Sequence, residues 1–336
     1  MFDDDTRVKF GNSRRMSLPI SMMTSSISHF VFKASCVVLL CSYLAYQFLS
    51  IGNTGYGISN IHVSTKLKDF QKMYTTPYEG CESLVLKDGA IYAGSVQGKI
   101  LKIDEFGVHH FAELNDKDCS TGQCGRPLGL RLSPDRQHLL VSDAYLGIFS
   151  ISLATGKITF IMRYPGVSKK LFPLEENFRV TFFNDLDVMP NGTIIVSESS
   201  TVHGVDDVLS VVFEDPPSGR LLSIDPISGH WYELLSNLHF ANGVQLHTDG
   251  ESVLVAELGK SRILRVPLNG SHVTTFAENL IGYPDNIRPS PRGGFWVPVT
   301  NLKTSPWAKF RSLPHYSRLI KRAVISVSCC FSLSIY

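Results

Sequence analysis

Apolar and polar residues follow a strand–turn–strand unit that recurs from about residue 80 onward. Each unit has an alternating apolar run, a turn of Gly, Asp or Pro, and a second run rich in β-branched residues, which is the pattern of a β-hairpin. The turn centres near positions 88, 135, 191, 249 and 292 are 47, 56, 58 and 43 residues apart, spacings typical of β-propeller repeats. The five units begin near Ser83, Gly129, Asp185, Gly243 and Asn286.

A further pair of strands follows several of these units, as in GKILKID ending at Asp104 and GRLLSID ending at Asp225. Four short strands in sequence order make one propeller blade. A β-sandwich also has short strands, but it would space single strands evenly instead of repeating one unit at a long period. No amphipathic helix is predicted within the run, so the pattern favours an all-β fold over an α/β fold.

The repeat stops early in its fifth unit. Little follows Val299, and residues 301–336 contain no further turn of the Asp-Gly type. A propeller closes by pairing its last blade with its first, because an open one leaves strand edges exposed. We therefore expect a C-terminally truncated propeller of about four and a half blades over 80–300, and a divergent tail over 301–336. An inactive truncated isoform is one interpretation of this pattern.

A different pattern precedes the repeat: residues 30–51 form an apolar run whose only charge is Lys33. About 20 such residues are enough for a helix to cross a bilayer. Basic residues before or within the run outnumber those shortly after it by five to two, which predicts a type II orientation. The two groups are Arg7, Lys9, Arg14, Arg15 and Lys33, and Lys66 and Lys68.

This orientation predicts a cytoplasmic tail over 1–29, a signal-anchor helix over 30–51 and a lumenal linker over 52–79. The propeller would then lie outside the plasma membrane or inside the endoplasmic reticulum. A cleaved signal peptide is the alternative, although such peptides normally have a shorter lead than 29 residues. Both interpretations place the repeats in the same compartment.

The composition of the 336 residues is that of a globular protein, with 43% hydrophobic and 18% charged residues. Lys and Arg number 32 and Asp and Glu 30, for a net charge of +2. This balance argues against nucleic acid as a partner, because electrostatic binding to phosphates needs a basic surface.

Cysteines and glycosylation sequons agree with an oxidising compartment. Cys119 and Cys124 flank a short polar loop, CSTGQC, and no second pair with zinc-ligand spacing accompanies them. A local disulfide is therefore the favoured interpretation. The sequons at Asn191 and Asn269 lie in turn-like sequence, where a glycan would be accessible.

A polar residue stands just before the first strand of most units. These positions converge on one axis in a propeller, because the first strand of every blade lines the central channel. Carboxylate and amide oxygens gathered there would suit a hard cation such as Ca²⁺. Each residue alone could simply shape a turn, but a common phase in several repeats favours the metal site. The candidate ligands are Glu82, Asn184, Asn242, Asp285 and Asn286.

Several motifs together resemble the strictosidine synthase-like family of six-bladed propellers, in particular its animal, membrane-anchored branch. The resemblance covers about residues 58–300 and is carried by GRPLGLRLSPDRQHLLVSDAYLGI, FNDLDVMPNGTIIVSESS, GRLLSIDPISG, FANGVQLHTDGESVLVAELGKSRILRV and GYPDNIRPSPRGGFWV. It implies a type II membrane glycoprotein whose extracellular or lumenal propeller has arylesterase activity. It also implies a disulfide loop at Cys119 and Cys124.

More distantly, the pattern is similar to paraoxonases and gluconolactonase-type calcium propellers. That similarity implies the same metal ligands, Glu82, Asn184, Asn242, Asp285 and Asn286. This sequence departs from these families at two places, which limits the activities that the resemblance implies. The segment 126–129 (RPLG) stands where paraoxonases place a histidine dyad. The last-blade glutamate of strictosidine synthases has no counterpart, so their condensation reaction is not expected.

Two functions of different classes follow from these features. The first is a calcium-dependent hydrolase of small-molecule aryl esters or lactones, attached to the membrane by its N-terminal helix. The second is a non-catalytic extracellular binding or adhesion propeller in which the cation is structural. The histidines of the chain, including His203, His239 and His247, are expected to be surface or structural residues, because lone histidines usually are.

Overall fold

The computed structural model describes residues 80–114, 124–163, 181–312 and 321–322. The apolar run at 30–51, the tail at 1–29, the linker at 52–79 and Cys119 lie outside these residues. Within them, no helix has the length and apolar character needed to cross a bilayer.

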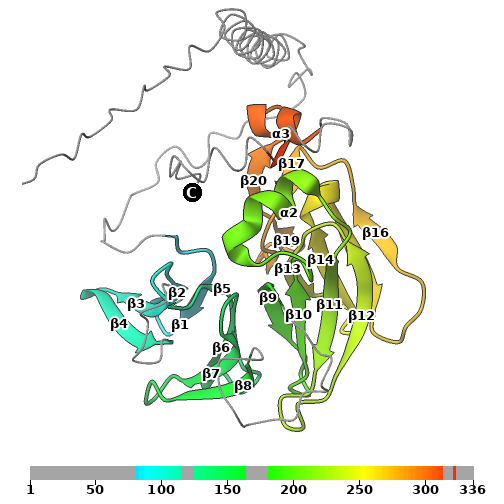
Figure 1. The fold of residues 1–336 in the computed structure, drawn as a ribbon. Coiled ribbons are helices and arrows are strands. Elements are labelled where there is room, and N and C mark those ends of the chain that lie inside the picture. Colours follow the sequence, from blue (N-terminus) through cyan, green and yellow to red (C-terminus); the bar gives the residue numbers. More distant parts are fainter. Residues whose placement is uncertain (1–79, 115–123, 164–180, 313–320, 323–336) are drawn as a thin grey trace, which may run out of the picture. The chain divides into compact units, whose positions relative to one another are not determined.

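The described part is built from antiparallel β-sheets, which confirms the all-β prediction. Four sheets have four strands each, and in every one the strands lie in sequence order (Figure 1). The first sheet has β1 (Leu84–Lys87), β2 (Ala90–Gly94), β3 (Lys99–Asp104) and β4 (Gly107–Glu113). The second has β5 (Pro127–Leu132), β6 (His138–Asp143), β7 (Gly147–Ser152) and β8 (Ile158–Arg163).

The third and fourth sheets follow the same plan. The third has β9 (Phe183–Val188), β10 (Ile194–Glu198), β11 (Gly219–Ile224) and β12 (Trp231–Leu238). The fourth has β13 (Ala241–Leu246), β14 (Ser252–Glu257), β15 (Arg262–Pro267) and β16 (Thr274–Ala277). Two pairs come last, β17 (Gly282–Pro284) with β20 (Val299–Leu302), and β18 (Arg288–Pro289) with β19 (Phe295–Trp296).

Turn chemistry explains how the hairpins form where the repeat predicts them. The link between β1 and β2 consists of Asp88 and Gly89, and the register pairs Lys87 with Ala90. Both turn residues have positive φ, 50° and 78°. That is the conformation of a two-residue hairpin turn, for which Asp-Gly is a preferred sequence.

The core lies between consecutive sheets. Val85 and Ile100 of the first sheet pack with Leu130 and Phe149 of the second. Clusters of the same kind join the second sheet to the third and the third to the fourth. Because each sheet packs on the next, the first strands β1, β5, β9 and β13 become neighbours in that order. The polar residues at their starting ends are thereby brought to one end of the sheets.

The connection between the second and third strands of the third sheet contains a helix, which the sequence analysis did not predict. Residues 199–218, between β10 and β11, contain the short helix η2 (Val205–Asp207) and α2 (Val208–Glu214). The segment VLSVVFE is rich in β-branched residues, a composition that is typical of a strand. Tertiary packing overrides this propensity: Val211 of α2 is buried against residues of three sheets.

The segment after β20 packs on this helix. α3 (Pro306–Arg311) begins at the N-cap Ser305, and its Phe310 ring lies 5.0 Å from that of Phe213 in α2. Arg311 donates to the carbonyl of Val212 over 2.7 Å, and Lys321 to that of Phe213 over 3.1 Å. Cations at the C-terminal carbonyls of a helix are favourable, so this segment holds α2 in place. A short 3₁₀ helix, η3 (Leu258–Lys260), completes the elements described.

Candidate functional site

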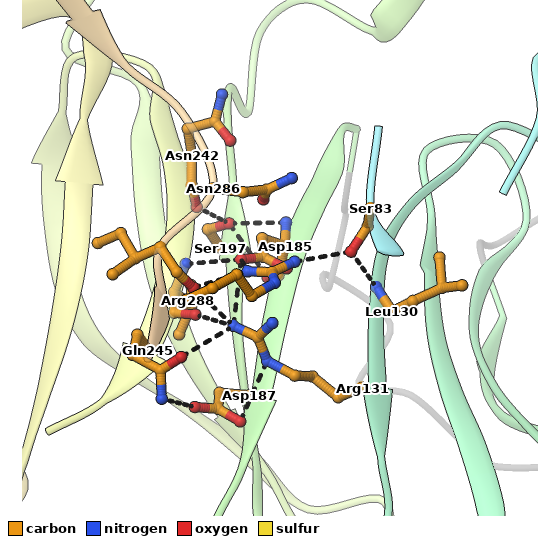
Figure 2. A network of polar contacts seen from close by, with 12 residues as sticks. Ser83, Leu130, Arg131, Asp185, Asp187, Ser197, Asn242, Gln245, Asn286 and Arg288 are labelled. Carbon is orange, nitrogen blue, oxygen red and sulfur yellow. Dashed lines mark hydrogen bonds and ion pairs between the residues drawn. The ribbon is translucent and has the colours of Figure 1, made fainter. Parts of the chain in front are cut away.

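All five predicted ligands lie at the starts of the first strands. Asn184 and Asn242 are the second residues of β9 and β13. Glu82 precedes β1 by two residues, and Asp285 and Asn286 lie between β17 and β18. Figure 2 draws Asn242 and Asn286 above Asp185 in that view.

Specific contacts bring these residues together across some two hundred positions of sequence. Asn286 donates from Nδ2 to the carbonyl oxygen of Glu82 over 3.2 Å. The Asn242 side chain lies close enough to the Asp285 carboxyl to lower its pKa, and the Glu82 and Asp285 carboxylates lie close enough to repel each other. The five residues therefore come from the first, third and fourth sheets and from the β17–β18 connection.

Asn184 joins the same group through a serine. Its Nδ2 donates to Ser199 Oγ over 3.0 Å, and Ser199 Oγ donates to the carbonyl of Ala241 over 2.8 Å. Ala241 is the neighbour of Asn242. These bonds use the amide nitrogen of Asn184 and leave its oxygen directed elsewhere.

Unsatisfied oxygen atoms are the most unusual feature of this group. The Oδ1 atoms of Asn184, Asn242, Asp285 and Asn286 are all buried, and none has a hydrogen-bond partner within the described residues. A buried polar atom without a partner costs about 1–3 kcal/mol, so four acceptors in one place call for a ligand that can bind oxygen. A cation is such a ligand. No cluster of three or more His, Cys, Asp or Glu groups suited to a metal occurs in the described residues, since only Glu82 and Asp285 of this set are carboxylates.

Electrostatics at the site favour a positive charge. Burial raises the pKa of the Glu82 carboxyl, and the nearby Asp285 raises it further, while Arg126 and Arg288 act in the opposite direction. Burial also raises the pKa of Asp285, helped by the charge of Asp185. Both carboxylates would thus be stabilised in their ionised form by a cation placed between them.

A second group of polar residues, which we call the hub network, follows these ligands along the same strands. Figure 2 shows it between the strands. At its centre Arg288 forms a two-pronged ion pair with the fully buried Asp185, Nη1–Oδ2 2.8 Å and Nη2–Oδ1 3.1 Å. Its Nη2 also donates to Ser83 Oγ over 2.7 Å. The hub network consists of Ser83, Arg131, Asp185, Asp187, Gln245 and Arg288.

Arg131 extends the hub network to the second and fourth sheets. Its Nε donates to Asp187 Oδ1 over 3.2 Å, and its Nη2 donates to the carbonyls of Val244 and Ile287 over 2.6 and 3.1 Å. Asp187 also accepts from Nε2 of Gln245 over 2.9 Å. Strands β5, β9, β13 and β18 therefore contribute to one charged network, together with Ser83 immediately before β1. The sequence analysis missed it, although charged residues within apolar first strands were a visible signal.

In the second sheet Leu128 holds the position equivalent to Asn184 and Asn242, and an arginine stands two residues before it. Arg126 stands immediately before β5, and its Nη1 donates to the carbonyl of Gly80 over 3.4 Å. Its charge lowers the pKa of Glu82. Nearby, Cys81 is exposed and not disulfide-bonded. Cys124 is disulfide-bonded, and its predicted partner, Cys119, remains a prediction.

Apolar side chains cover this end of the sheets. Residues from three of the sheet regions form one buried cluster beneath α2, which we call the apolar roof: Leu128, Ala144, Phe182, Val211, Phe240 and Leu258. Tyr283 and the valines of η2 and α2 pack against it. An aromatic or aliphatic group bound near the ligands would therefore meet apolar surroundings on this side.

Both sequons lie in turns at exposed positions. The side chains of Asn191 and Asn269 each accept a hydrogen bond from a backbone N–H two residues later, over 3.0 Å in both cases. Asn191 is in the β9–β10 turn, and Asn184 is at the opposite end of β9. Glycosylation at these two residues remains a prediction.

Comparison with known proteins gives a consistent family assignment. The profile of the strictosidine synthase family matches residues 184–271, and that of the strictosidine synthase-like N-terminal domain matches 62–103. Adipocyte plasma membrane-associated protein of Salmo salar is 36% identical over 250 residues, 72% of this chain and 58% of its own length. The human protein of that name is 31% identical, over 85% of this chain and 69% of its own.

A plant protein shows the same relation. STRICTOSIDINE SYNTHASE-LIKE 2 of Arabidopsis thaliana is 35% identical over 273 residues, 74% of this chain and 69% of its own length. The chain thus spans somewhat more than half to about two thirds of these relatives.

Proposed function

Because the chain belongs to the strictosidine synthase-like family, together with the adipocyte plasma membrane-associated proteins, we propose that it is a calcium-dependent hydrolase of aryl esters or lactones. The four-stranded sheets are taken as blades of a six-bladed family propeller, of which this chain supplies about four and a half. The observation that carries the proposal is the set of four buried, unpartnered Oδ1 atoms at the starts of the first strands.

These residues fit a calcium ion chemically. Glu82, Asn184, Asn242, Asp285 and Asn286 would hold it, since Ca²⁺ prefers carboxylate and amide oxygens and tolerates irregular geometry. When bound, the ion would polarise the ester carbonyl and stabilise the developing oxyanion. The amide nitrogens of Asn184 and Asn286 are already engaged with Ser199 and Glu82, which leaves their oxygens available to a cation.

The surroundings suit an ester with an apolar part. The apolar roof excludes water at this end of the sheets, and Arg126 supplies a positive charge near Glu82. The Arg288–Asp185 ion pair lies beyond the ligands and holds their strands in register. Preorganised groups of this kind stabilise a transition state without further rearrangement.

Removal of calcium is the direct test of this function. We expect the purified full chain to hydrolyse phenyl acetate or an aromatic lactone with calcium, and to lose this activity with a chelator. Calcium at 100 times its Kd should also stabilise the fold by about 2.7 kcal/mol. A fall in Tm on chelation with no hydrolysis at any calcium concentration would favour the alternative, a binding propeller with a structural cation. Hydrolysis that a chelator leaves unchanged would reject the calcium mechanism.

The raised pKa of Glu82 predicts a pH dependence of stability in the absence of calcium. Its folded-state pKa of about 8 lies above the ordinary value of 4.5, so the folded state holds this proton where the unfolded state has lost it. The contribution of Glu82 to the free energy of unfolding is fully present below pH 4.5 and is lost as the pH rises through about 8. We expect Tm to fall across this window less in Glu82→Gln than in the wild type. Saturating calcium should remove the difference in slope, and equal slopes without calcium would contradict the assignment.

We also propose that the protein is a type II membrane glycoprotein. In this proposal residues 30–51 anchor it in the membrane, and Asn191 and Asn269 carry glycans. The names of the animal relatives support attachment to the plasma membrane. The exposed turn positions of both sequons support glycosylation. A glycosidase should increase electrophoretic mobility of the protein expressed in animal cells, and an unchanged mobility would contradict this topology.

A further inference from the structure

The insertion between β10 and β11 places a histidine against a carboxylate. His203 Nδ1 lies 2.6 Å from Asp207 Oδ2, and the other oxygen of Asp207 accepts from Ser210 Oγ over 2.7 Å. The backbone N–H of His203 donates to Ser200 Oγ over 3.0 Å, which orients the residue further. The imidazole is about one fifth exposed, so it is held by the protein and still accessible.

The position of Asp207 makes this contact unusual. Asp207 is the N-cap residue of α2, where an aspartate normally accepts hydrogen bonds from backbone N–H groups of the first turn. Its side chain makes no such bond here, and both of its oxygens are used by His203 and Ser210. Because an ionised carboxylate can only accept, a neutral His203 carries its proton on Nδ1 and keeps a lone pair on Nε2.

The pair lies at the same end of the sheets as the predicted ligands. Glu198, the last residue of β10, pairs with Phe183, the residue before Asn184. The insertion therefore starts at Ser199, which accepts the Asn184 hydrogen bond. Only three residues separate Ser199 from His203.

A second contact ties the insertion to the second sheet. The Tyr145 hydroxyl, from the β6–β7 connection of the second sheet, donates to Asp206. The charge of Arg126 acts on Tyr145 and on Glu82 alike. The residue beside Asp207 is thus hydrogen-bonded to the second sheet, which Arg126 immediately precedes.

We propose that His203 is the general base of the hydrolysis and that Asp207 is its positioning residue; the inference rests on the proposed hydrolase function. His203 Nε2 removes a proton from water, and the hydroxide forms a bond to the ester carbonyl carbon. When the carbon–oxygen bond to the alcohol breaks, the imidazolium returns the proton to the departing oxygen. Atoms and charges balance without a further reactant, and the products are the acid and the alcohol.

The test compares His203→Ala with a matched histidine. His247 also contacts a carboxylate, with Nδ1 2.9 Å from Asp249 Oδ2, and is similarly buried, but it lies after β13, at the opposite end of that strand from Asn242. We expect His203→Ala to lower kcat for phenyl acetate by about 10²–10⁴-fold with the calcium dependence of Tm unchanged, and His247→Ala to leave kcat near the wild-type value. Added imidazole should restore part of the activity of His203→Ala only.

Two further readouts separate a catalytic role from a structural one. Diethyl pyrocarbonate should modify His203 in the wild type, as located by mass spectrometry, with a parallel loss of activity. Asp207→Asn should lower kcat while His203 remains in place. Full activity of a folded His203→Ala would overturn the inference and leave the proposed function standing. A wild type that binds calcium but hydrolyses no ester or lactone would overturn both.

Discussion

Substitution of Asp285 by alanine is expected to abolish calcium-dependent hydrolysis at calcium concentrations that saturate the wild type. Asp285 supplies one of the two carboxylates of the site and one of its four unpartnered oxygens. Loss of a group that merely supports a metal ligand lowers metal affinity about 10–100-fold, so loss of a direct ligand should lower it by at least about 100-fold. Calorimetric titration of calcium, run beside the phenyl acetate assay, measures both effects.

The calcium-free state of the same variant gives an independent check. Without a cation, Glu82 and Asp285 raise each other's cost of ionisation, so Asp285→Ala should not lower the Tm of the calcium-free protein through loss of charge. Asp225 provides the control, because it is an exposed aspartate that accepts hydrogen bonds within the β11–β12 turn. Calcium affinity equal in the wild type, Asp285→Ala and Asp225→Ala would refute the assignment of the site.

Substitution of Arg288 by methionine is expected to cause the largest loss of stability. Asp185 is fully buried, and Arg288 supplies two of its hydrogen bonds. Removing one partner of a buried ion pair costs about 3–5 kcal/mol, because the other charge is left without compensation. Arg131 Nη2 lies 3.6 Å from Asp185 Oδ2. At this longer distance Arg131 compensates the charge of Asp185 only in part. Urea unfolding of the full chain measures the change in the free energy of unfolding.

A peripheral arginine offers the matched control for this prediction. Arg265 on β15 pairs with Asp249, but its side chain is 41% exposed, so Arg265→Met should cost less than about 1 kcal/mol. The double variant Asp185→Asn with Arg288→Met should recover part of the loss, since no buried charge then lacks its partner. Equal losses in the two single arginine variants would mean that the hub network does not hold the first strands together.

The repeat pattern was sufficient to predict that the ligand candidates lie at the same ends of their strands. Glu82, Asn184, Asn242 and Asp285 stand at the same phase of units that fold alike, so the alternation of strands and turns alone places them at equivalent ends of their strands. The hub network is less visible in sequence. Arg131 and Asp187 are 56 residues apart, and nothing local indicates that their charges pair.

The sequence by itself determined the all-β fold, because period-2 alternation and turn residues act over a few neighbouring positions, and its motifs were sufficient to identify the family by resemblance. Only the tertiary structure decided that VLSVVFE is a helix, since burial of Val211 beneath the sheets outweighs its strand propensity. It likewise decided that His203 contacts Asp207, because that contact needs the turn η2 to bring the two residues together. Side-chain partners depend on how distant segments pack, and local sequence preferences carry little of that information.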